Sequence, residues 1–160
     1  MERKGFYHIC TDGNALSWMF KDDQDFIAGI NRIGICKIIS GVLVWAYTLM
    51  DNHVHLLLNG TLPMCKSFID KYKLLTGKWI SHKYKISKQI KELSVSIIPL
   101  KTEEDILDIF TPEELYQQWR LVNIIFYHEK GPSGIKEKFL NGVSTPLLEQ
   151  IINEIERAHV

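Results

Sequence analysis

Two histidines separated by one residue are the clearest candidates for chemistry in this sequence. Residues 51–58 read DNHVHLLL, and residues 53–59 are predicted to form a β-strand. Side chains alternate between the faces of a strand, so His53 and His55 point the same way while Val54 and Leu56 enter a core. Two neutral imidazoles on one face can bind a divalent cation and leave positions open for a substrate oxygen. The alternative interpretation is a pair of strand histidines without a metal.

Three neighbouring residues could complete such a site. Asp51 and Asn52 directly precede the pair and could each supply an oxygen ligand, although a role in the turn is expected for both. His8 lies on the first predicted strand and could approach the pair, although a hydrogen-bonded core histidine is the commoner case.

The predicted elements that would position the pair follow one another in the order β-α-β-β-α-β, with helices after them. This order fits an α+β protein with a ferredoxin-like, four-stranded antiparallel sheet, helices on one face and additional C-terminal helices. Residue patterns predict strands over 6–11, 36–49 (with a bulge at Gly41), 53–59 and 93–100. They predict helices over 23–34, 64–83, 111–130 and 145–158.

Composition excludes several classes of protein. Of the 160 residues, 46 % are hydrophobic and 24 % charged, which is typical of a globular domain rather than a disordered chain. No apolar run reaches the ~18 residues of a membrane span. Three cysteines, an odd number without a CxxC motif, predict reduced thiols, and no signal-peptide pattern is present. We therefore expect a cytoplasmic protein.

The net charge is zero, but the middle third of the chain is basic. Residues 61–101 contain nine lysines against Asp70 and Glu92, a balance of +7. Such a segment can attract phosphate groups, and the alternative is a solvated lysine-rich helix face. Aromatic residues interleave with these lysines and could stack bases. The candidates for DNA binding are Lys71, Lys78, Lys83, Lys85 and Arg120.

Four segments in order extend the histidine motif into a family resemblance. They are YHICTDG (7–13), MFKDDQDF (19–26), AYTLMDNHVHLLL (46–58) and FIDKYK (68–73). Between about residues 5 and 108 the chain resembles the single-tyrosine HUH transposases, especially the REP-associated tyrosine transposases and related insertion-sequence enzymes. Asp51 stands where that family usually has proline.

The resemblance implies a mechanism and its components. A tyrosine hydroxyl attacks a phosphodiester of single-stranded or hairpin DNA, forming a 5′-phosphotyrosine link and leaving a free 3′-hydroxyl. A Mg²⁺ or Mn²⁺ ion held by His53 and His55 polarises the scissile phosphate. Residues 1–130 would form the catalytic domain, and residues 131–160 would form a linker and an amphipathic helix. A homodimer is also compatible with the resemblance.

The expected nucleophile region departs from the family pattern. The family places its tyrosine on a helix after the last strand, usually followed by Asn-Pro, whereas this chain reads TPEELY at 111–116 without Asn-Pro. Tyr116 is the first candidate, with Gln117 and Arg120 near it, and Tyr127 is the second. Both could instead be ordinary tyrosines of an amphipathic helix. A catalytically degenerate DNA-binding module and a metallohydrolase without covalent catalysis are therefore the alternative functions.

Overall fold

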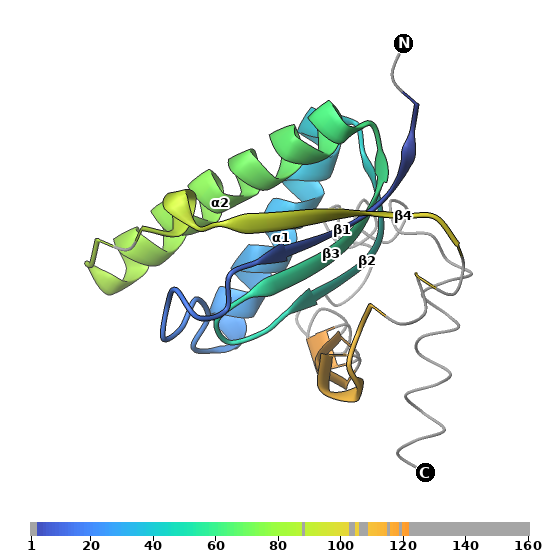
Figure 1. The fold of residues 1–160 in the computed structure, drawn as a ribbon. Helices are drawn as coiled ribbons and strands as arrows, with labels where there is room; N and C mark the ends of the chain where they lie inside the picture. Colours follow the sequence, from blue (N-terminus) through green and yellow to red (C-terminus); the bar gives the residue numbers. More distant parts are fainter. Residues whose placement is uncertain are drawn as a thin grey trace, which may run out of the picture.

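A four-stranded antiparallel sheet forms the centre of the protein (Figure 1). Its strands β1 (Gly5–Thr11), β2 (Leu43–Leu49), β3 (Val54–Gly60) and β4 (Val95–Leu100) lie in the order β2-β3-β1-β4. This computed structural model describes residues 3–87, 89–102, 105, 109–114, 116–118, 120 and 121. The α+β class predicted from the sequence is confirmed. The predicted boundary near residue 130 and the predicted helix 145–158 lie outside the described residues.

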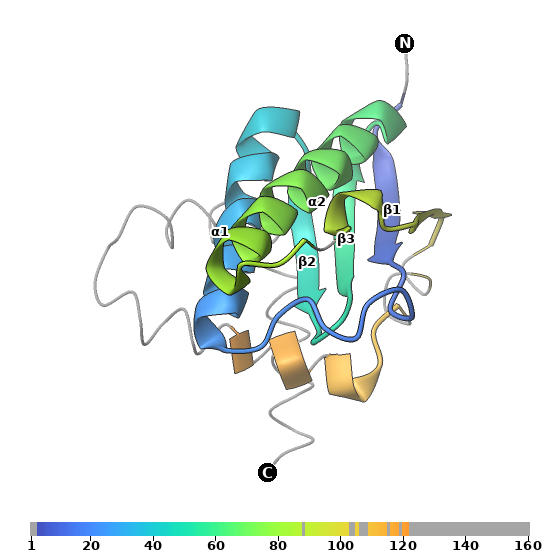
Figure 2. The same ribbon diagram turned by 90° about the vertical axis from the view of Figure 1, so that its left-hand side faces the viewer.

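Two long helices cover one face of the sheet (Figure 2). Helices α1 (Asp23–Ser40) and α2 (Leu62–Tyr84) pack against each other and against the strands, and a short 3₁₀ turn, η1 (Ile90–Glu92), leads from α2 into β4. The main core lies between this helical layer and the sheet. Fully buried side chains from both layers fill it, among them Ile9, Ile33, Leu56, Phe68 and Tyr72. In the part of the chain that the structure describes, no helix combines the length and apolarity needed to cross a bilayer.

The first helix is longer than its sequence pattern predicts. The prediction of a strand from residue 36 and of a bulge at Gly41 is wrong, because α1 continues to Ser40 and Gly41 caps it with φ 82°. Cys36 continues the buried stripe of Ile30 and Ile33, so packing at helical spacing outweighs the local β-propensity of the isoleucines around it. The irregularity in β2 occurs instead between Val44 and Ala46.

The second face of the sheet carries the candidate site. Ile9 and Leu56 point into the helix-covered core, whereas His8 and His55 alternate with them and point to the other side. Part of this second face is covered by the chain after β4, where Phe110 packs with Ala46 and Leu57. We call this side of the sheet the open face, since neither α1 nor α2 covers it.

A buried carboxylate joins the start of α1 to the end of α2. Asp25 is 0 % exposed and accepts hydrogen bonds from the backbone of Lys21 (2.8 Å), from Lys83 Nζ (2.8 Å) and from the Tyr84 hydroxyl. It also completes a capping box with Asp22, which caps α1. Charge-assisted hydrogen bonds to a buried group are strong, and each donor loses its partner if the carboxylate is removed.

Replacing this carboxylate should destabilise the fold. We expect Asp25→Ala to lower the free energy of unfolding by about 3 kcal/mol, since it leaves the Tyr84 hydroxyl and the Lys21 N–H without their acceptor and leaves Lys83 paired with Asp22 alone. Asp70→Ala is the matched control, because Asp70 is exposed and its ion pair with Lys73 Nζ is long, at 4.0 Å. The change in the free energy of unfolding should stay within about 0.5 kcal/mol. Urea denaturation measures both, and equal effects would contradict this account of the network.

Candidate metal centre

His53 and His55 lie at the beginning of β3 with their rings side by side on the open face. The ring centroids are 4.8 Å apart. His53 Nδ1 lies 2.7 Å from Asn52 Oδ1, and the amide nitrogen of Asn52 donates to the carbonyl of Gly13 at 2.7 Å. This chain of contacts assigns the proton of His53 to Nδ1 and leaves the Nε2 lone pair for a cation. Asn52 therefore orients His53 instead of serving as a ligand.

Glu114 brings a carboxylate to the two imidazoles. Its Oε2 contacts His55 Nε2 and lies 3.9 Å from His53 Nε2, and the three ligand atoms lie within 4.8 Å of one another. Glu114 is only 6 % exposed, and Oε2 is buried without a hydrogen-bond partner. Buried carboxylate oxygens normally accept hydrogen bonds or bind cations. The arrangement therefore suits a divalent ion.

Local sequence explains how Glu114 is held. The helical segment starts at Pro112, and Thr111 caps it: Glu114 N–H donates to Thr111 Oγ1 (3.2 Å), while Thr111 N–H donates to Glu114 Oε1 (2.8 Å). This is a capping box with proline at the first helical position. One carboxylate oxygen thus serves the helix terminus, and the other remains for the histidines.

The same segment is tied to β2, and Figure 1 shows it in orange near the end of that strand. Thr48 Oγ1 donates to the Glu114 carbonyl at 3.2 Å, and Gln117 Nε2 donates to the Leu49 carbonyl at 2.9 Å. Gln118, 0 % exposed, also contacts Thr48 at 3.4 Å. These bonds fix the position of the helical segment along β2 and its rotation about its own axis.

Burial favours the neutral form of His55 and His8. It lowers the pKa of His55 to about 4, although Glu114 acts in the opposite direction, and it also lowers the pKa of His8. His8 Nε2 lies 3.0 Å from His55 Nδ1, with the two rings stacked. His8 thus approaches the pair, which the sequence offered only as the less common alternative to a core histidine. Neutral imidazoles keep a lone pair available for a metal.

Two imidazoles and one carboxylate could hold a divalent cation and leave positions for a substrate oxygen. This ligand set resembles open metal sites in which substrate or water completes the coordination. His8, behind His55, would act as an orienting partner in the second sphere. The described residues thus fit the predicted divalent cation. These ligand types suit several divalent ions.

The tyrosine candidates are placed differently from the ligands. Tyr116 is 42 % exposed and lies on the helical segment that supplies Glu114. Two residues along an α-helix correspond to a rotation of about 200°, so Tyr116 leaves the helix on the side opposite to Glu114. Tyr127 lies outside the described residues. The identity of the nucleophile therefore stays a prediction.

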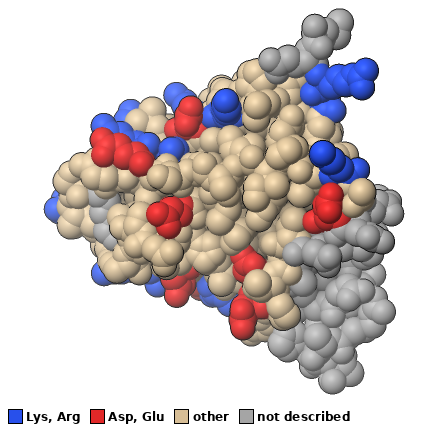
Figure 3. Space-filling view, viewed as in Figure 1, with Lys and Arg blue, Asp and Glu red and all other residues tan. Residues whose placement is uncertain are grey.

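The predicted DNA-binding lysines lie on α2, on the side of the sheet opposite to the histidines. Figure 3 shows basic side chains along the upper rim of the molecule, with acidic side chains among them. Lys83 forms ion pairs with Asp22 and Asp25. Lys85 caps α2 in the left-handed conformation, with φ 54°.

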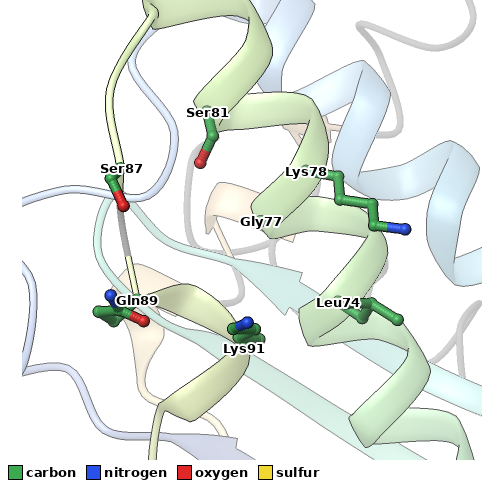
Figure 4. Close-up of a pocket in the computed structure, with 7 residues that line it drawn as sticks. All are labelled: Leu74, Gly77, Lys78, Ser81, Ser87, Gln89 and Lys91. Carbon is green, nitrogen blue, oxygen red and sulfur yellow. The ribbon is translucent and has the colours of Figure 1, made fainter.

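Lys78 occupies a more open environment. A cavity of about 260 Å³ between α2 and η1 is lined by two lysines together with Leu74, Gly77, Ser81, Ser87 and Gln89 (Figure 4). The second lysine is Lys91, and within the described residues neither ammonium group forms an ion pair. Lys71 is half-buried on α2. Arg120 lies on the segment that carries Glu114, where it contacts Gln117 (3.0 Å) and Asp23 (3.3 Å).

Sequence reasoning missed Glu114 as a ligand candidate. The motif TPEE predicted a helix start with carboxylates in its first turn, which is correct. Nothing in that pattern indicates which of its two carboxylates contacts His55, nearly sixty residues earlier in the chain. Cys10 was also missed, because its proximity to His55 depends on the pairing of β1 with β3.

Comparison with solved structures gives a distant structural likeness. A "putative transposase" from Deinococcus radiodurans R1 matches with a TM-score of 0.46 and 16 % sequence identity, over 67 % of this chain and 87 % of that one. A likeness this distant carries no argument about function. No protein-family model matches the chain, and no curated protein matches it.

Removing the Glu114 carboxylate should weaken metal binding. We expect Glu114→Gln to raise the Kd for Mn²⁺ at least tenfold, about 1.4 kcal/mol, because a neutral amide replaces the anionic ligand. Gln at this position retains the capping hydrogen bond. Glu113→Gln is the matched control, since it removes the same charge from an exposed neighbour. Isothermal titration calorimetry measures both, and equal Kd values for the two variants would contradict the site.

Proposed function

We propose that this protein is a metal-dependent DNA nuclease and strand transferase of the transposase type, acting on single-stranded or hairpin DNA. The observation that carries the proposal is the convergence of His53, His55 and Glu114 on the open face of the sheet. The sequence resemblance around the histidine pair supplies the reaction type. A Mg²⁺ or Mn²⁺ ion bound there would neutralise charge on the scissile phosphate.

The chain's own residues would perform the covalent step. A tyrosine hydroxyl oxygen forms a bond to phosphorus while the bond to the 3′-oxygen breaks, and the phenolic proton balances the charge on the released 3′-hydroxyl. Free tyrosine has a pKa near ~10, so the hydroxyl needs an activated phosphate. Because the phosphotyrosine link retains the energy of the original bond, rejoining requires no ATP. Tyr116 and Tyr127 are the candidate nucleophiles.

The DNA would extend beyond the metal centre. Arg120 lies on the Glu114 segment, whereas Lys71, Lys78 and Lys83 belong to α2 across the sheet, and Lys85 caps its C-terminal end. A strand that contacts both sets must pass around an edge of the sheet. Lys78 beside the α2–η1 cavity is the better placed lysine, since Lys83 already neutralises two carboxylates.

A second candidate function is a DNA-binding module that has lost cleavage. One observation favours it: Tyr116 leaves the helix on the side opposite to Glu114. The missing Asn-Pro pair after the predicted nucleophile agrees with this alternative. Such a module would keep salt-sensitive binding to DNA without forming a covalent link.

Covalent trapping distinguishes the two functions. Wild-type protein incubated with a labelled single-stranded oligonucleotide and Mn²⁺ should give an adduct that survives denaturing electrophoresis. We expect Tyr116→Phe to abolish the adduct, because the attacking oxygen is gone, and Tyr7→Phe on β1 is the control. Tyr127→Phe is tested in parallel as the second candidate. If wild-type protein binds the oligonucleotide without forming an adduct, the module is favoured.

Salt dependence tests the role of Lys78. The logarithm of affinity for single-stranded DNA falls with the logarithm of salt concentration by about 0.7 for each phosphate contact. Lys78→Ala should therefore reduce the slope by about 0.7, while Lys37→Ala on α1 should leave it unchanged. Fluorescence anisotropy at several salt concentrations measures the slopes. Identical slopes for both variants would remove Lys78 from the binding surface.

A further inference from the structure

Cys10 lies beside the metal centre and has no role in the function proposed above. It pairs with His55 across β1 and β3, so both side chains project from the open face. Cys10 Sγ is 3.8 Å from His55 Nε2, the same nitrogen that contacts Glu114 Oε2. The thiol is half-buried and donates to the Thr11 carbonyl at 3.2 Å. A sulfur atom thus lies beside His55, one of the three candidate ligands.

An independent observation indicates that a cation belongs at this point. Glu114 is 6 % exposed, and its buried Oε2 has no hydrogen-bond partner among the described residues apart from its direct contact with His55 Nε2. Leaving a buried carboxylate oxygen without a donor is costly, and a bound cation removes that cost. The unfavourable burial of this oxygen does not depend on the thiol.

The distance between Cys10 and His55 is close to that of a sulfur and a nitrogen ligand on one tetrahedral ion. Zinc–sulfur bonds of ~2.3 Å and zinc–nitrogen bonds of ~2.0 Å at tetrahedral angles separate the two ligand atoms by about 3.5 Å. The Cys10 Sγ to His55 Nε2 distance is 3.8 Å. The ligand atoms of His53, His55 and Glu114 lie up to 4.8 Å from one another and would move closer together around an ion. The direct contact between His55 and Glu114 is closer than such a site requires, so it would open around the ion.

We infer that Cys10 is a fourth ligand, which closes this centre around a thiophilic divalent cation such as Zn²⁺. The sulfur–metal bond forms as the thiol proton is released to solvent. Thiolate ligands favour Zn²⁺ and Co²⁺, whereas Mg²⁺ and Mn²⁺ prefer oxygen. Those oxygen-preferring ions would use His53, His55 and Glu114 and leave positions open.

The inference shares its metal centre with the proposed function and adds a form of regulation to it. Four protein ligands fill a tetrahedral ion, as in structural zinc sites, whereas catalytic sites keep an open position. The zinc-bound form would have no position for a phosphate oxygen. Zn²⁺ is therefore expected to hold the protein in a closed form that excludes the DNA phosphate.

Cobalt spectroscopy tests the sulfur ligand directly. Wild-type apoprotein titrated with Co²⁺ should show the visible bands of tetrahedral cobalt and a near-ultraviolet thiolate-to-cobalt charge-transfer band. Cys10→Ala should lose the charge-transfer band and bind Zn²⁺ at least tenfold more weakly, with its Kd for Mn²⁺ changed less than about twofold. Cys65→Ala, which removes a buried thiol from the helix-covered core, is the matched control and should retain the band.

Two results would overturn the inference. One is a charge-transfer band that persists in Cys10→Ala, and the other is a wild-type spectrum of octahedral cobalt without that band. Cys10→Ser, which keeps nearly the same side-chain volume, replaces the alanine variant if the latter does not fold. The Mn²⁺-dependent DNA adduct is scored separately, so a failed adduct assay contradicts the proposed nuclease without affecting the cobalt result.

Discussion

The contact between the Glu114 segment and the open face is the interaction on which the metal centre depends. Without it, His53 and His55 would be two strand histidines supported only by Asn52 and His8. The contact is built from backbone and side-chain hydrogen bonds, since Thr48 binds the Glu114 carbonyl and Gln117 binds the Leu49 carbonyl. The Glu114 carboxylate is therefore held in one orientation toward the histidines, as a preorganised metal site requires.

The sheet also divides the protein into two surfaces with different chemistry. On the helix-covered side, charge is used largely for structure: Asp25 joins α1 to α2, and Lys73 donates to the Leu93 carbonyl at 2.8 Å next to η1. On the open face, the titratable groups contact one another, since Glu114 Oε2 contacts His55 Nε2 and His8 lies beside His55. The net charge of residues 61–101 therefore overstates the positive charge available to a ligand. That charge also belongs to a surface away from the histidines.

Local sequence predicted the parts of the site that depend on one element. Strand alternation placed His53 and His55 together and Val54 opposite them, and the TPEE motif located a helix start. Local sequence reasoning failed for α1 beyond residue 34. There the burial of Cys36 stabilises a helix, whereas the neighbouring isoleucines favour a strand. Glu114 and Cys10 could not be assigned, because their proximity to His55 arises from docking and strand pairing between distant segments.

Helical geometry sets a constraint between metal binding and the predicted nucleophile. Glu114 and Tyr116 lie two residues apart on one helical segment, so about 200° of rotation separates them and only one can face the histidines. Turning Tyr116 toward the pair would withdraw Glu114 and break the bonds to Thr48 and Leu49. Attack by Tyr116, if it is the nucleophile we propose, would therefore require that the DNA reach around the helix, or that the helix rotate and the candidate centre lose its carboxylate. Metal binding and tyrosine attack on this segment would thus need different rotations of the helix.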